Sequence, residues 1–380
     1  MLRRNELEKL SENAIVIQNE ILIACSGIFT GQQEENNHIM NSTNCFYISG
    51  MTEDCNGGIF RCIWRNRTPE VKDFYPLERN LCLSWGATRE TIYASTQHNG
   101  IGAVAAYNAD QNGKLHLLNK MPANGQSVCF LQISPDGKFL YSANYASGNI
   151  SEFTIAADGS LAALKQNISH SGKSIHAEQT SPHPHCCTFT PDKKYLCVTD
   201  LGTDKIIFYP YDPDEGASPV AAAEYSVTPG SGPRHLFFDP GSGFAYLICE
   251  LSNVIQRFSY TGGNLNFIDT ISTLPTGENN SSASTMKFSG NGRFLFAGNR
   301  GSDTIAVFAV NKNSKLTAEK FYPAGGSSPR DFNFLPGTNI LAVANEFSGK
   351  TVFFTCDDST GQIFEVCGEL PLPRPLFILV

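Results

Sequence analysis

A repeating unit constrains the fold of this chain more than any other feature. From Leu81 onward six copies follow one another, each with an apolar run, a turn rich in Pro, Gly or Asp, a second apolar run, and a short polar loop before a third run. Self-similarity at a period of about fifty residues is typical of β-propellers and solenoids. The turns begin at Ser84, Ser134, Thr190, Asp239, Ser289 and Leu335, at spacings of 50, 56, 49, 50 and 46 residues.

The apolar runs have the character of strands. In the clearest copy, Phe130–Ile133 leads into the turn Ser134–Lys138, which is followed by Phe139–Asn144 and then by Ile150–Thr154. Short runs of this kind, rich in Val, Ile, Phe and Tyr and bounded by Gly, Asn, Asp or Pro, predict strands. No window of helical length shows a sustained apolar period of 3.6 residues. Each copy is therefore predicted to form a small antiparallel sheet.

Two pieces of chain outside the six copies also resemble strands, namely residues 46–64 near the front and residues 375–380 at the end. A C-terminal strand that pairs with the first blade closes a ring and covers sheet edges that otherwise promote aggregation. We therefore predict an all-β fold, a seven-bladed β-propeller over residues 45–380, in which the N- and C-terminal strands share one blade. An open solenoid or a pair of β-sandwiches is the alternative, and the repeat period favours the propeller.

Residues 1–44 stand apart from the repeat. Their apolar stretches, residues 14–17 and 21–25, are separated by polar residues, so they match neither a signal peptide nor a membrane span. We expect a peripheral or partly disordered N-terminal extension and no membrane association. The oligomeric state, monomer or dimer, is left open.

Charge and cysteine content limit the partners and the compartment. The net charge of -8 argues against nucleic acid as a partner, whereas a local arginine cluster is still able to bind a small anion. The 12 cysteines include no CxxC pair, which argues against a disulfide framework or a zinc site and favours a reducing compartment. A cytoplasmic protein is the expectation.

Four polar segments lie at corresponding ends of successive blades. In a propeller such positions converge around the central channel, so residues far apart in sequence can share one pocket. The segments are Ser181-Pro182-His183-Pro184-His185, Ser231-Gly232-Pro233-Arg234-His235, Cys249-Glu250-Leu251-Ser252 and Gly298-Asn299-Arg300-Gly301.

These residue types suit hydrolysis of an ester without a metal or cofactor. Histidine is able to act as a general base near neutral pH, and arginines bind an anion or stabilise an oxyanion. A carboxylate orients either group or acts as the base itself. Structural alternatives exist for each residue. His183 and His185 lack a third metal ligand at suitable spacing, Arg234 and Arg300 could pair across blades, and Glu250 could be solvated or paired.

Several motifs in one order resemble the seven-bladed propeller lactonase family, which includes propeller-type 6-phosphogluconolactonases and fungal carboxymuconate cyclases. The resemblance runs from about Cys45 to the C-terminus. The motifs are Gly102-Ala103-Val104-Ala105-Ala106-Tyr107, Asn144-Tyr145-Ala146-Ser147-Gly148, Pro182-His183-Pro184-His185, Asp200-Leu201-Gly202-Thr203-Asp204, Gly232-Pro233-Arg234-His235, Glu250-Leu251-Ser252-Asn253 and Asn299-Arg300-Gly301.

The resemblance implies hydrolysis of a sugar lactone, above all 6-phospho-D-glucono-1,5-lactone to 6-phosphogluconate in the pentose phosphate pathway. Matched residue by residue, it implies that His185 or Glu250 activates water while Arg234 and Arg300 hold the phosphate or the developing oxyanion. Further contacts to this small anionic substrate are expected from three other side chains. These are His183, His235 and Arg330.

The chain also departs from the family pattern, which leaves other functions open. Glu178 and Cys249 replace commoner residues beside the motifs, as do Thr285 and Lys287. A cyclase or isomerase acting on a carboxylated muconate could use the same Arg and His residues. A non-catalytic binding ring is the other alternative, although the chain lacks the repeated Trp-Asp and Gly-His signatures of WD scaffolds.

Overall fold

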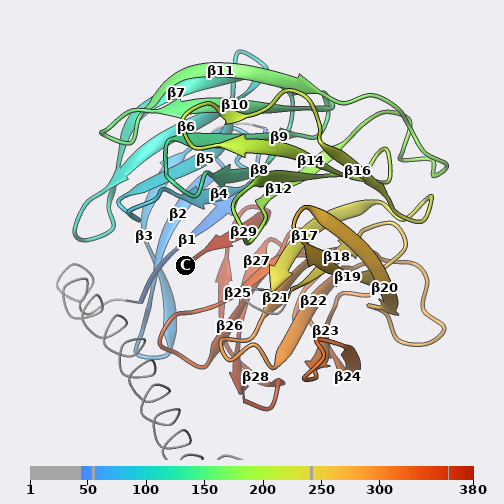
Figure 1. Ribbon diagram of the computed structural model, residues 1–380. Helices are drawn as coiled ribbons and strands as arrows, with labels where there is room; N and C mark the ends of the chain where they lie inside the picture. Colours follow the sequence, from blue (N-terminus) through green and yellow to red (C-terminus); the bar gives the residue numbers. More distant parts are fainter. Residues whose placement is uncertain (1–43, 54–55, 240–242, 358) are drawn as a thin grey trace, which may run out of the picture. The chain divides into compact units, whose positions relative to one another are not determined.

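The computed structural model describes residues 44–53, 56–239, 243–357 and 359–380. Apart from Asn44, which begins the first strand, the predicted extension of residues 1–44 lies outside the described residues. Every regular element within the described ranges is a β-strand (Figure 1).

The strands form seven sheets, which are the blades. The first blade combines β29 (Pro375–Leu379) with β1 (Asn44–Gly50), β2 (Gly58–Arg65) and β3 (Thr68–Pro76). The second and third contain β4 (Leu83–Trp85), β5 (Thr91–His98), β6 (Ile101–Ala109) and β7 (Leu115–Gly125), then β8 (Val128–Ile133), β9 (Phe139–Asn144), β10 (Asn149–Ile155) and β11 (Leu161–Ser169).

The fourth blade is irregular, because two short strands take the place of one outer strand. It contains β12 (Pro184–Phe189), β13 (Tyr195–Asp200), β14 (Lys205–Asp212), β15 (Gly216–Ala217) and β16 (Ala223–Ser226). The fifth has β17 (Pro233–Asp239), β18 (Phe244–Cys249), β19 (Val254–Thr261) and β20 (Asn264–Ser272). The last two have β21 (Ser282–Phe288), β22 (Phe294–Arg300), β23 (Thr304–Val310) and β24 (Leu316–Pro323), then β25 (Pro329–Phe334), β26 (Ile340–Asn345), β27 (Lys350–Asp357) and β28 (Gln362–Pro371).

Each blade has one edge strand that contacts the corresponding strands of the two neighbouring blades. These seven strands form a closed ring in the order β29, β4, β8, β12, β17, β21, β25 and back to β29. We call each of them the first strand of its blade. The last strand of the chain closes this ring, because β29 pairs antiparallel with β1 and places Ile378 opposite Ile48. The prediction of a seven-bladed propeller with one blade shared by the two chain ends is confirmed. The longest repeat spacing, 56 residues, includes the long connection of residues 170–183 between β11 and β12.

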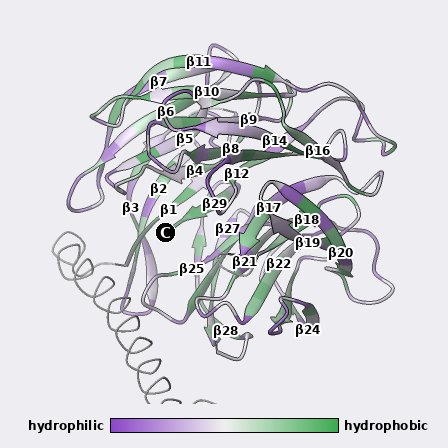
Figure 2. Cartoon of the chain, in the orientation of Figure 1, coloured by the Kyte–Doolittle hydropathy of each residue, from purple (hydrophilic) through white to green (hydrophobic). Residues whose placement is uncertain are grey.

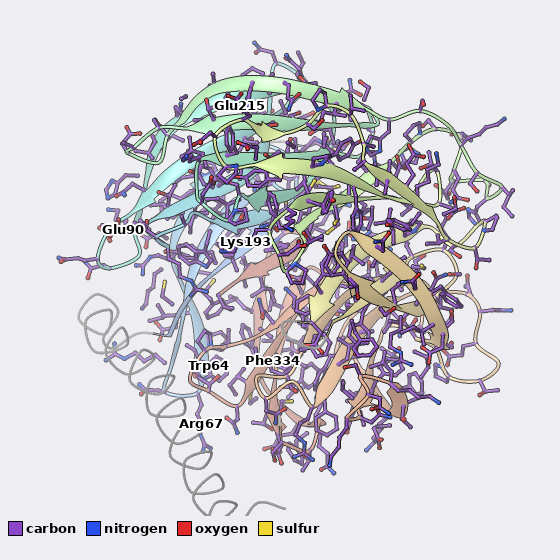
Figure 3. All side chains as sticks on the ribbon, viewed as in Figure 1. Trp64, Arg67, Glu90, Lys193, Glu215 and Phe334 are labelled. Carbon is purple, nitrogen blue, oxygen red and sulfur yellow. The ribbon has the colours of Figure 1, made fainter. Side chains whose placement is uncertain are left out.

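Apolar side chains fill the space between blades. The middle strands β9 and β26 are buried at every residue, whereas the outer strand β20 is mostly exposed. Figure 2 colours the residues of the strands by hydropathy, from purple for hydrophilic to green for hydrophobic. One core cluster joins the first blade to the seventh through Phe46, Ile48 and Ile378 on one side and Leu335 and Phe353 on the other. Trp64 belongs to this cluster, and Phe334 packs against the cluster that joins the sixth and seventh blades; both residues are labelled in Figure 3.

A β-bulge recurs near the start of the first strand in most blades. In β17, Pro233 pairs with Cys249 and His235 with Ile248, so the intervening Arg234 has no partner in the ladder. Such a bulge re-aims the extra side chain and is common beside active sites. In four other blades the corresponding extra residues are Cys129 in β8, His185 in β12, Arg330 in β25 and Leu376 in β29. In β21 the register also shifts, between Ala283 and Met286.

Candidate functional site

The bulges direct their side chains into the channel. A cavity of about 30 Å³ is lined by the extra residues of five blades, with neighbours from the same strands. Proline precedes the bulge in four of them, and a proline suits the first position of a strand because it has no N–H to offer the ladder. The lining residues are Leu81, Cys129, Phe130, His185, Arg234, His235, Arg330, Asp331, Leu376 and Phe377.

Arg234 is the centre of the buried part of the site. Its Nη1 donates to His185 Nε2 at 2.5 Å and also to Glu250 Oε2. Because arginine only donates, Nε2 of the neutral imidazole accepts and Nδ1 carries the proton. That Nδ1 has no hydrogen-bond partner, nor does Arg234 Nε. Both side chains are almost completely buried, at 3% exposure for His185 and 4% for Arg234.

Glu250 connects two blades. Its Oε2 accepts from Arg234 of its own blade, and its Oε1 accepts from Arg300 Nη2 of the next blade at 2.8 Å. Arg300 Nη2 also donates to the Ala283 carbonyl oxygen at 3.1 Å. The structure thus brings His185, Arg234, Glu250 and Arg300 together at one end of the channel. Arg300 is at the same time an inter-blade ion-pair partner, which is the structural alternative that the sequence left open.

The charges around Glu250 determine its ionisation. Burial raises the pKa of this carboxyl, but the guanidinium groups of Arg234, Arg300 and Arg330 outweigh burial and bring the pKa to about 2. Burial, reinforced by Arg234, holds the pKa of His185 well below its usual value. At neutral pH the site therefore contains an ionised carboxylate and a neutral imidazole between arginines.

The two other histidines have different surroundings. His235 lines the cavity, and its Nδ1 lies 3.3 Å from Thr285 Oγ1. The ring of His183 stacks on Tyr145 with 4.3 Å between ring centroids and an interplanar angle of 9°, and its Nδ1 lies 2.8 Å from the Tyr145 carbonyl oxygen. His183 is not among the residues that line the cavity, so its predicted contact with the substrate gains no support from this geometry.

Arg330 lines the cavity and is more accessible than Arg234, since 29% of its side chain is exposed. Its Nη1 lies 3.9 Å from Glu346 Oε2, and Arg374 Nη2 lies 2.5 Å from the other oxygen of the same carboxylate. Glu346 and Arg374 were not identified from the sequence. The sequence does contain a repeat that points to Glu346. Pro329-Arg330 repeats Pro233-Arg234 two blades later, and Glu346 follows its strand at the position that Glu250 has in the earlier blade.

The departures from the family pattern divide into two groups. Thr285 and Lys287 contact two residues that line the cavity: Thr285 Oγ1 lies 3.3 Å from His235 Nδ1, and Lys287 Nζ lies 3.5 Å from Asp331 Oδ1. Cys249 is buried in an apolar cluster between the fourth and fifth blades. Glu178 is exposed in the connection before β12. Only the first group is placed to affect what the channel binds.

Within the described ranges, no three His, Cys, Asp or Glu side chains are grouped so as to hold a metal ion. The same part of the chain has no helix with the length and apolar character needed to cross a membrane.

The fold and site define a class of protein, a seven-bladed propeller with an arginine-rich charged cluster at one end of its channel. Residues 46–380 match the model of the family described as "Lactonase, 7-bladed beta-propeller". The chain belongs to this lactonase family.

Individual relatives agree with this assignment. The 6-phosphogluconolactonase of Bacillus subtilis (strain 168) is 36% identical over 292 residues, which cover 76% of this chain and 83% of the relative. The structure of a periplasmic gluconolactonase from Pseudomonas aeruginosa superposes with a TM-score of 0.82 at 28% identity, covering 89% of this chain and 98% of that one. A protein from Lactobacillus plantarum gives a TM-score of 0.81 at 28% identity over 89% of this chain and 99% of that one.

Proposed function

We propose that this protein hydrolyses 6-phospho-D-glucono-1,5-lactone to 6-phosphogluconate, as a cytoplasmic enzyme of carbohydrate metabolism that needs no metal. The observation that carries the proposal is the Glu250 carboxylate held between Arg234 and Arg300 at the channel. Membership of the lactonase family and the similarity to the Bacillus subtilis 6-phosphogluconolactonase support the choice of reaction.

The lactone is too large for the cavity of about 30 Å³, which has the scale of a water molecule. It binds at the accessible side of the cluster, where 16% of the Glu250 side chain and 15% of Arg300 are exposed. His185 lies behind Arg234 and holds it in place through the 2.5 Å contact.

In the reaction, a water oxygen attacks the lactone carbonyl carbon and forms a tetrahedral oxyanion. Arg300 and Arg234 stabilise this negative charge, which is the part of catalysis that positioned cations supply best. The bond from the carbonyl carbon to the ring oxygen then breaks. The proton lost by water passes by way of Glu250 to the ring oxygen, which becomes a hydroxyl group of the open acid.

Glu250 contributes more by orientation than by basicity. A carboxylate with a pKa of about 2 is a weak base at neutral pH, because the best general bases have a pKa near the working pH. Sugar-acid lactones open spontaneously in water, so stabilisation of the oxyanion and alignment of the water account for most of the acceleration. His185 stays neutral and acts on the substrate only through Arg234.

A panel of substrates tests the proposal. Purified protein is mixed with freshly prepared 6-phosphogluconolactone, gluconolactone or carboxymuconate, and acid release or ring formation is followed against the spontaneous rate. Acceleration above background is expected for the two lactones and greatest for the phosphorylated one. Ring formation from carboxymuconate alone would instead identify a cyclase, and no acceleration of any of the three would indicate a non-catalytic ring.

A further inference from the structure

The charged cluster around Glu250 has a second copy in the seventh blade. In the fifth blade Pro233 pairs with Cys249, and in the seventh Pro329 pairs with Asn345. Each proline is followed by a bulged arginine, so Arg234 corresponds to Arg330. Cys249 and Asn345 end their strands and are each followed by a glutamate, so Glu250 corresponds to Glu346. The propeller repeat therefore places the same Arg and Glu pair at two sites on the channel, two blades apart.

Each glutamate takes one guanidinium from its own blade and one from the next. Glu250 pairs with Arg234 and Arg300, and Glu346 lies next to Arg330 and pairs with Arg374. Arg374 comes from the link between β28 and β29, immediately before the strand that closes the ring.

The two copies differ in how firmly the carboxylate holds the arginine of its own blade. Arg234 donates a short hydrogen bond to Glu250 and is 4% exposed. Arg330 lies 3.9 Å from Glu346, beyond hydrogen-bonding distance, and is 29% exposed. Glu346 instead makes its short contact, 2.5 Å, with Arg374. The side chain of Arg330 is thus partly exposed and only loosely paired with a carboxylate.

The surroundings of Arg330 add positive charge. Although 29% of its side chain is exposed, the partial burial of Arg330 lowers its pKa to about 10, and the neighbouring Arg234 and Arg300 contribute to the same decrease. Arg330 still carries its proton at neutral pH. Four guanidinium groups, those of Arg234, Arg300, Arg330 and Arg374, face the carboxylates of only Glu250 and Glu346. The cluster therefore has a net positive charge, which favours an anion on its accessible side.

We propose that Arg330, with Arg374 and Glu346 beside it, forms a separate subsite that binds the phosphomonoester of the substrate, while Arg234, Glu250 and Arg300 act on the lactone carbonyl. This inference rests on the proposed function and assigns its phosphate specificity. A phosphomonoester offers three acceptor oxygens and close to two negative charges at pH 7, which suits the planar donors of arginine. Glu346 limits the affinity, because it competes with the phosphate for both guanidinium groups.

Inorganic phosphate is the probe that tests the subsite without catalysis. Its dissociation constant is measured by calorimetry for the wild type and for Arg330→Met, Glu346→Gln and Lys350→Gln. Loss of a charge-assisted contact in Arg330→Met is expected to weaken binding about tenfold or more. Glu346→Gln removes the competing carboxylate and is expected to tighten binding, a gain that misfolding cannot produce. Lys350 pairs with Glu369 on the outer strands of the same blade, so Lys350→Gln is the matched control and retains wild-type affinity.

Kinetics and competition test whether the subsite recognises the phosphate group of the substrate or the carboxylate of the product. The ratio of kcat/KM for 6-phosphogluconolactone to that for gluconolactone is expected to fall about tenfold or more in Arg330→Met. Gluconate, which has the carboxylate and no phosphate, should not compete with inorganic phosphate for the wild-type protein. Equal losses on the two lactones, unchanged phosphate affinity in Arg330→Met, or competition by gluconate would overturn the subsite. If neither lactone is hydrolysed but phosphate binding depends on Arg330, the proposed function fails and the anion subsite stands.

Discussion

Glu250 shows how one side chain connects the stability of the propeller with its chemistry. Its two oxygens accept from guanidinium groups of neighbouring blades, so it joins the blades and at the same time aligns the two arginines. A buried ion pair of this kind is costly to form and costly to break, because its charges have left water. The arrangement is therefore better explained by a function at the channel than by stability alone.

His235 makes stability depend on pH. Burial, with help from Arg234 and Lys287, holds its pKa well below the ordinary value of 6.5. Below pH 6.5 the unfolded chain takes up a proton on this histidine and the folded protein does not, so stability falls as the pH falls. Between pH 7 and pH 5 the wild type is expected to lose more unfolding free energy than His235→Asn does. Urea denaturation at both pH values measures the difference, and equal losses would show that the folded protein protonates His235 as readily as the unfolded chain.

At the scale of strands, the recurrent bulge explains why the site residues point inward. Each bulge puts one extra residue into the first strand of a blade, and in three blades that residue is His185, Arg234 or Arg330. The segment beside the first of these bulges is held by a buried carboxylate. Asp200 accepts from the backbone N–H of His183 at 2.8 Å and contacts His170 Nδ1 at 2.7 Å.

Removal of Asp200 is expected to destabilise the fourth blade. Besides the contacts to His183 and His170, its Oδ1 accepts the N–H groups of Gly202 and Thr203. Asp200→Ala leaves these buried donors without partners and is expected to cost about 3 to 5 kcal/mol of unfolding free energy. Asp212 is an exposed carboxylate that caps its own turn, so Asp212→Ala serves as the control and should cost about 1 kcal/mol or less. A similar loss in both variants would contradict the role assigned to Asp200.

The strands could be predicted from the sequence because the turns that separate them are local features. Ser134–Lys138 contains its own turn residues, and the apolar runs on either side need no distant partner to be identified as strands. The pairing of Arg300 with Glu250 could not be predicted, since it depends on how two blades pack. Arg374 was missed for the same reason, because its partner Glu346 comes from a different blade. Glu346 itself could have been found by extending the comparison of repeats from Pro233-Arg234 to Pro329-Arg330.

At the scale of the whole molecule, stability depends on closure of the ring by β29. Ile378 is completely buried and packs in the cluster with Phe46, Ile48 and Leu335. Ile378→Ala is expected to cost about 2 to 5 kcal/mol of unfolding free energy, because it leaves a cavity between the first and last blades. Val366, 48% exposed on the outer strand β28, gives a control that should change stability by about 0.5 kcal/mol or less when replaced by alanine. Chemical denaturation of both variants decides the point, and a loss in Ile378→Ala no larger than in the control would show that closure contributes little.

The central claim is that the cluster around Glu250 hydrolyses a phosphorylated sugar lactone. Its most direct test is acid release from fresh 6-phosphogluconolactone by the wild type, Glu250→Gln and Glu224→Gln at equal protein concentration. Glu224 pairs with Lys205 on the outer strands of the fourth blade and is the matched control. We predict acceleration by the wild type and by Glu224→Gln, and a loss of kcat/KM of about a hundredfold or more in Glu250→Gln, as expected when a group that positions charge in the transition state is removed. Acceleration by the folded Glu250→Gln variant equal to that of the wild type would contradict the account.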